Sequence, residues 1–182
     1  MTEKTSASAI WSHFDGPAQT RTNFARTGGG GDEVAAEAAP LTPAVADLAC
    51  RQPPSHFTRM AAVAEVLPGV MLMDTCAAGV RGALLDPQAR GHLESGLTVI
   101  NAGNAHTFAA LVRGDRLWGI YEHHTGLLSP EKLWDQVGRF QQGQLTNTEV
   151  FDDQGHGCAY AADFSAKDSF AFTVITGPRR RL

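Results

Sequence analysis

The spacing of apolar residues changes along the chain and predicts where helices and strands lie. Apolar positions from Met60 to Leu67 recur with helical spacing, which predicts a helix over residues 57–67. The unbroken apolar run at residues 70–73 predicts a short buried strand. Asp74 then precedes a stretch of small residues, so we expect it to cap a helix over residues 76–85, which Asp86 and Pro87 end.

The most regular pattern follows, and it predicts three consecutive strands. Apolar and β-branched side chains are frequent in three segments, residues 97–100, 106–112 and 116–122. The turn Asn101–Asn104 joins the first two strands, and a Gly-Asp pair at residues 114–115 favours a tight hairpin between the second and third. Short connections of this kind predict an antiparallel meander.

Helical signals come after the meander, and one more strand closes the chain. Ser129 and Pro130 predict the start of a helix that Gly143 ends, and a shorter helix is expected near residues 146–151. Residues 155–157 are expected to form a loop, and residues 170–175 a strand. The fold class is therefore α/β with a mixed sheet. The βββαβ order is that of an actin-like ATPase (ribonuclease H-like) core domain, as in actin, sugar kinases and Hsp70-type chaperones.

Composition divides the chain near residue 55. Residues 1–55 are rich in Gly, Pro and Ala and include four consecutive glycines at 28–31, which predicts a flexible leader with one short helix. These glycines lack the Lys-Ser or Lys-Thr of a phosphate-binding loop. Residues 56–182 are expected to form a single domain.

Charge and cysteine content exclude several classes of protein. The net charge of −4 argues against a nucleic-acid partner. No apolar run reaches the length of a membrane span, so no membrane partner is expected. Three widely spaced cysteines predict no disulfide framework and favour a cytoplasmic location.

The first candidate site is a phosphate-binding turn that would hold a nucleotide or phosphate, with ATP and Mg²⁺ as candidate cofactors. Its backbone amides would face the anion, and a glycine-containing loop later in the chain would lie nearby with an acid for Mg²⁺. The alternative is an ordinary hairpin turn and an exposed loop. The cofactor-binding candidates are Asn101, Gly103, Asn104, Thr107, Gly155 and Gly157.

The second candidate site is a histidine-centred metal site of the hydrolase type. Imidazoles and carboxylates can together bind a divalent transition metal. Adjacent His123 and His124 point to opposite faces of an extended strand, so at most one joins a site on one face. The alternative is a set of separate structural histidines that hydrogen-bond loops. The catalytic candidates are His106, Glu122 and His156, and the metal candidates are His123, His124 and Asp153.

Four segments carry a family resemblance: NAGNAHTFAALVRGDRLWGIYEHHTG at residues 101–126, MDTCAAGVRGALLD at 73–86, GQLTNTEVFDDQGHG at 143–157 and TGPRR at 176–180. In this order they resemble a prokaryotic family of unknown function labelled "putative pyruvate formate-lyase activating enzyme". The resemblance implies similarity to actin-like ATPases. It also implies a nucleotide- or phosphate-binding C-terminal half, because family members open with an Asp-x-Gly-x-Gly-Thr phosphate turn that this chain lacks.

The family label and the missing half lead to two further expectations. A glycyl-radical activase needs an iron–sulfur cluster on cysteines spaced CxxxCxxC. Cys50, Cys76 and Cys158 do not have this spacing, so no iron–sulfur cluster is expected. A domain without its other half would expose a sheet or cleft face, which favours a homo-oligomer and leaves a non-catalytic, self-associating domain as a further alternative.

Overall fold

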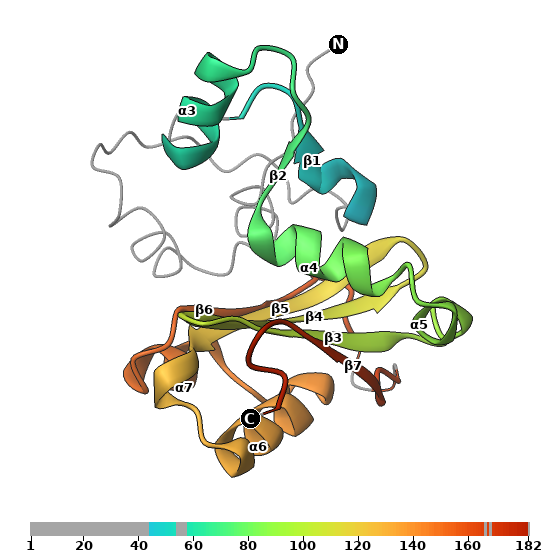
Figure 1. Ribbon diagram of the computed structural model, residues 1–182. Coiled ribbons are helices and arrows are strands. Elements are labelled where there is room, and N and C mark those ends of the chain that lie inside the picture. The colour runs from blue at the N-terminus through green and yellow to red at the C-terminus, as the bar shows by residue number, and fades with distance from the viewer. Residues whose placement is uncertain (1–43, 54–57, 166, 168, 182) are drawn as a thin grey trace.

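The apolar segments of the chain form a five-stranded mixed sheet with helices on both faces (Figure 1). The computed structural model describes residues 44–53, 58–165, 167 and 169–181. Strand order is β6-β5-β4-β3-β7, with β7 parallel to β3 and the other neighbours antiparallel. The strands are β3 (Leu97–Ala102), β4 (His106–Arg113), β5 (Arg116–His124), β6 (Gly157–Tyr160) and β7 (Phe172–Thr176).

The predicted meander is present as β3, β4 and β5, and its strands are longer than the pattern indicated. β3 continues to Ala102 and β5 to His124, because both extra ends still pair with β4. Gly114, with φ +61°, lies in the tight turn between β4 and β5. The pattern missed β6, whose residues were expected to begin in a loop, because a strand of four residues is too short to show a period.

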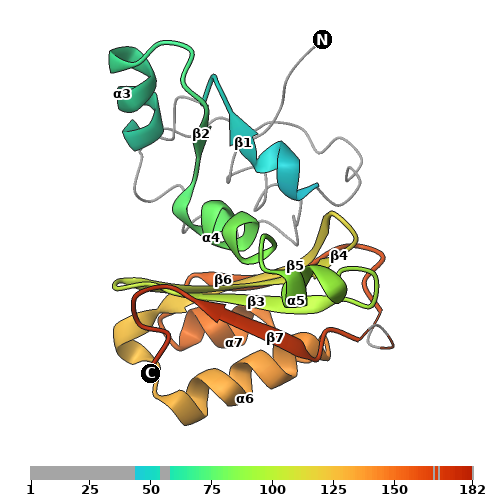
Figure 2. The same ribbon diagram turned by 45° about the vertical axis from the view of Figure 1, so that its right-hand side comes forward.

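One face of the sheet is covered by α6 (Pro130–Gln141) and α7 (Asn147–Asp152) (Figure 2). Ser129 caps α6 by accepting from the backbone N–H of Lys132, and Thr146 and Glu149 form a capping box on α7. The apolar stripe of α6 packs against side chains from the strands. This first cluster includes Ile100, Ala109, Leu111, Tyr121, Leu133, Val137, Phe140 and Cys158.

The opposite face is covered by the 3₁₀ helix η2 (Val45–Leu48), α4 (Thr75–Ala83) and α5 (Pro87–Gly91). Asp74 caps α4 as predicted, since its carboxylate accepts from the backbone N–H of Cys76. Asp86 does more than end that helix: it caps α5, and Pro87 occupies the first turn.

Residues 44–50 belong to the folded structure although composition assigned them to the leader. Val45 and Leu48 are 1% and 0% exposed and lie in the core beside α4. β1 (Ala49–Cys50) pairs with β2 (Leu72–Met73), and α3 (Thr58–Val66) lies beyond this two-stranded ribbon, away from the main sheet (Figures 1 and 2). Residues 1–43 of the predicted leader, including the four glycines, lie outside the described residues.

Exposed apolar side chains follow α3 and the segment after it: Val63, Val66, Leu67 and Met71. Self-association through such a surface stays a prediction. Within the described ranges, none of the helices has the length and apolar character required to cross a bilayer.

Replacing Leu48 by Ala tests whether η2 is part of the core. Because the Leu48 side chain is fully buried, we expect the free energy of unfolding to fall by about 2–5 kcal/mol in urea denaturation. The control is Leu67→Ala, where the side chain is 55% exposed and a loss under about 0.5 kcal/mol is expected. Equal effects of the two substitutions would contradict the packing described.

Candidate metal centre

Three histidines meet at one end of the sheet. His106 is the first residue of β4 and His124 the last of β5, and the two are direct partners in the antiparallel ladder. Paired residues of a ladder project to the same face. His156 precedes β6, and its backbone N–H donates to the carbonyl oxygen of Glu122 at 3.0 Å. These contacts bring the third ring to the side of the first two.

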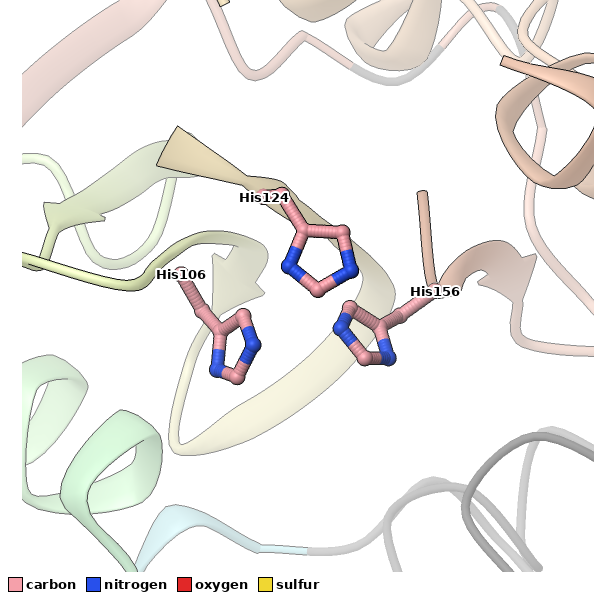
Figure 3. A group of neighbouring side chains, drawn as sticks. All are labelled: His106, His124 and His156. Carbon is pink, nitrogen blue, oxygen red and sulfur yellow. The ribbon is translucent and has the colours of Figure 1, made fainter. Parts of the chain in front are cut away.

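The three rings share one space, and a nitrogen of each ring is directed into it (Figure 3). One ligand nitrogen from each of His106, His124 and His156 lies within 4.8 Å of the others. The ring centroids lie 5.0 Å apart for His106 and His124, 4.7 Å for His106 and His156, and 4.5 Å for His124 and His156. Among the described residues, this is the group of His, Cys, Asp and Glu side chains whose geometry suits a metal ion.

The surroundings lower the pKa of two of these imidazoles. Burial, then the neighbouring His106, His124 and His123, lower the pKa of His156 to about 4. Burial, His124 and Arg59 lower the pKa of His106. Neutral imidazole is the form that binds a metal, so the lowered pKa of each ring favours its use as a ligand.

His156 has an unsatisfied nitrogen. Its Nε2 is buried and has no hydrogen-bond partner within the part of the chain that the structure describes. Buried polar atoms normally have a partner, and one without a partner is frequently explained by an ion or a water molecule.

Glu122 lies on the same face, two residues before His124 on β5. Its side chain is 8% exposed, and its Oε1 lies 3.7 Å from Nδ1 of His106. Burial, followed by the negative charge of Asp74 at the start of α4, raises the pKa of Glu122 to about 7. A carboxyl group beside the rings therefore changes its charge near neutral pH.

His123 and Asp153, two of the predicted metal ligands, lie on the other face of the sheet. His123 is 0% exposed, and its Nε2 lies 3.1 Å from Oδ2 of Asp153. Lys132 and Gln136 of α6 also bind that oxygen. The structure therefore brings His124 together with His106 and His156, and it separates His123 and Asp153 from them.

The predicted phosphate turn uses several of its polar groups internally. The Gly103 N–H donates to the carbonyl oxygen of His106 at 3.0 Å. The Thr107 hydroxyl is buried and lies 3.0 Å from that of Thr125, which donates to the Gly103 carbonyl oxygen at 2.8 Å. Asn101 packs beside Gly79 of α4, and Asn104 is exposed at the tip of the turn.

Gly155 and Gly157 place His156. A Cβ on Gly155 would lie 2.6 Å from Cδ2 of His123 and 2.6 Å from Cγ1 of Val150, so only glycine fits between them. Gly157 begins β6 and pairs with Glu122. Both glycines thus allow the loop to approach β5 closely, which is a structural use.

The contacts of Lys132 and Gln136 with Asp153 were not predicted from the sequence. The proximity of Asp74 to Glu122 was not predicted either. The helical stripe of α6 placed Lys132 and Gln136 on that helix, but their contacts depend on how α6 packs against β5. No local pattern encodes that packing. The strand alternation, in contrast, did indicate that His123 and His124 separate.

A family model described as "Putative pyruvate format-lyase activating enzyme", a domain of unknown function, matches residues 37–182. The match begins before η2 and includes every described element. No curated protein and no solved structure matches the chain.

The Glu122→Gln protein tests the ionisation of this buried carboxyl group. Its pKa rises from 4.5 to about 7 on folding, so its contribution to stability is complete at acidic pH and is lost as pH rises through that interval. Between about pH 5 and about pH 8, the free energy of unfolding should fall less in the variant, by up to about 3 kcal/mol. Urea denaturation at both pH values measures it.

The exposed Glu94→Gln substitution is the matched control and should leave the pH dependence unchanged. If Glu122→Gln follows the wild-type pH dependence, Glu122 is ionised as easily in the folded protein as in the unfolded chain.

Proposed function

The chain belongs to the family described as "Putative pyruvate format-lyase activating enzyme", and within that family we propose that it binds one divalent transition-metal ion through His106, His124 and His156. The observation that supports the proposal most is the convergence of three imidazole nitrogens within 4.8 Å. Imidazole nitrogen suits Zn²⁺ and the neighbouring divalent metals.

The site needs only a small closure to fit such an ion. Nitrogens bound at about 2.1 Å in tetrahedral geometry lie about 3.4 Å apart. His106 is the ring that can move, since its side chain is 42% exposed. An ion would also give the buried Nε2 of His156 the partner it lacks.

In this proposal, the Glu122 carboxylate orients the His106 ring through its Nδ1, which is the nitrogen that does not bind the ion. Metal-binding histidines commonly donate their second ring N–H to a carboxylate, which fixes the orientation of the ring. With Nδ1 of His106 facing Glu122 at 3.7 Å, the Nε2 of that ring is the atom left for the ion. The carboxylates of Glu122 and Asp74 also offset the positive charge of an ion and of Arg59, which lies near His106.

Three protein ligands leave a coordination position open, which is the pattern of catalytic rather than structural sites. A Zn²⁺-class ion in such a site lowers the pKa of a bound water and supplies a nucleophile at neutral pH. The proposed activity is therefore of the hydrolytic type.

The family description names activation of pyruvate formate-lyase, and the cysteines do not fit an iron–sulfur cluster for that role. Cys76 lies on α4, on one face of the sheet, whereas Cys158 lies on β6 and packs with the cluster on the other face. Cys50 lies on β1. Cysteines on separate elements and opposite faces of the sheet do not support a shared cluster, so the proposal includes no radical chemistry.

Nucleotide binding in an actin-like fold is the second candidate, and the sheet order favours it. Three antiparallel strands followed by a strand parallel to the first are the arrangement expected of that core, and β3, β4, β5 and β7 have it. Because Gly103 and Thr107 use their polar groups within the turn, a phosphate would have to bind at the exposed Asn104. The turn ends at His106, so a phosphate there would lie beside the proposed metal.

Calorimetric titration of untagged, metal-free protein with Zn²⁺ tests the first proposal. We expect one ion per chain. The His124→Ala variant should bind at least about 100-fold more weakly, because only two ligands remain. His92→Ala is the control: this ring stacks on Phe172 near the other end of the sheet, and its loss should leave Zn²⁺ affinity unchanged. Equal affinities of the two variants would contradict the site.

Titration with ATP, with and without Mg²⁺, tests the second proposal. If the turn binds nucleotide, tryptophan fluorescence should saturate with ATP, and Asn104→Asp should weaken binding because it places a negative charge beside the phosphates. The matched control is Asp115→Asn, at the opposite end of β4. No saturation at millimolar ATP would reject nucleotide binding by this chain and leave the metal proposal standing.

A further inference from the structure

We infer that Asp153 is a positioning residue for the metal site, because from the opposite face of the sheet it joins the two segments that carry His124 and His156. The inference rests on the proposed function. Among the described residues, Asp153 makes no hydrogen bond or ion pair with any of the three proposed ligands, and it acts through the residues next to them.

One carboxylate oxygen receives three donors from two elements. Oδ2 of Asp153 lies 3.1 Å from Nε2 of His123, 2.6 Å from Nζ of Lys132 and 3.1 Å from Nε2 of Gln136. Lys132 and Gln136 are one helical turn apart on α6, so they present their donors side by side. The pKa of Asp153 is lowered chiefly by its bond with Lys132, so the acceptor is an ionised carboxylate.

The donors are themselves held in place. The Tyr121 hydroxyl donates to Oε1 of Gln136 at 2.6 Å, which turns the amide NH₂ of Gln136 toward Asp153. Lys132 also donates to the carbonyl oxygen of Leu127 at 3.0 Å. We call Asp153, His123, Lys132, Gln136 and Tyr121 the Asp153 network.

The network acts on both metal-binding segments. His123 directly precedes His124 on β5, so holding its ring through Nε2 holds the strand end that carries His124. Asp153 is three residues before His156, and between them Gly155 packs against the His123 ring. Fixing His123 to Asp153 therefore fixes the end of β5 to the start of the loop.

Among the described residues, few other hydrogen bonds join that loop to β5. They are the His156 N–H bond to the Glu122 carbonyl oxygen and the pairing of Gly157 with Glu122. Both lie on the His156 side of the loop. Without the Asp153 carboxylate, the start of the loop would lose its hydrogen bonds to β5 and α6, and the position of the His156 ring would vary.

The test is Co²⁺ binding by the full chain, followed by the d–d absorption of the bound ion. Asp153→Ala should weaken Co²⁺ binding by about 10- to 100-fold and reduce the absorption of the tetrahedral ion, because His156 is no longer held in place. Asp153→Asn keeps an acceptor oxygen and should recover part of the affinity. Asp152→Ala removes the exposed acid that immediately precedes Asp153, and this variant should bind Co²⁺ as the wild-type protein does.

A change in spectrum separates positioning from a general loss of stability, which would lower the amount of folded protein and leave the spectrum of bound Co²⁺ intact. If Asp153→Ala fails to fold, Lys132→Met removes the strongest donor from the partly exposed side of the network and should show the same shift in affinity and spectrum. Wild-type protein that binds no Co²⁺ would overturn the proposed function and this inference together. Wild-type binding with unchanged affinity and spectrum in Asp153→Ala and Lys132→Met would overturn this inference alone.

Discussion

The alternation of side chains along β5 is the constraint on which the site depends. β5 pairs with β4 on one edge and β6 on the other, so it cannot rotate or slip without breaking two ladders. Its last four residues therefore divide strictly: Glu122 and His124 face α4, and Tyr121 and His123 face α6. A register shift of one residue would move Glu122 and His124 to the α6 face and Tyr121 and His123 to the α4 face. Both the group of three histidines and the Asp153 network would then be lost.

The two faces stabilise buried polar groups by opposite means. Glu122 has little direct compensation, and burial raises its pKa to about 7. Asp153 receives three donors, and its pKa is lowered. The satisfied network on the α6 face gives rigidity to the strand end. On the α4 face, the buried Glu122 with its raised pKa and the unpartnered Nε2 of His156 are the groups suited to binding a cation.

Much of the fold could be predicted from the sequence, because period-two and helical patterns are local. The meander, the cap at Ser129 and the cap at Asp74 were confirmed. β6 and the core position of Leu48 were not predicted, because a four-residue strand and a short 3₁₀ helix owe their places to tertiary packing.

The histidines could be named as candidates, and their grouping could be predicted only in part. Alternation indicated that His123 and His124 cannot share a site, yet it could not choose between them. The choice follows from the ladder register, which pairs His106 with His124, and from the packing of Gly155 against His123. Asp153 was expected as a metal ligand because it lies in a polar loop that was predicted to approach the phosphate turn and supply an acid for Mg²⁺. Its side chain instead points to α6, where Lys132 neutralises it.

X-ray absorption at the zinc edge tests the central claim most directly, since it counts the ligands of a bound ion without any substitution. The account predicts three imidazole nitrogens at about 2.0–2.1 Å with one further light atom and no sulfur. A first shell that contains sulfur, or fewer than three imidazoles in the stoichiometric complex, would contradict it.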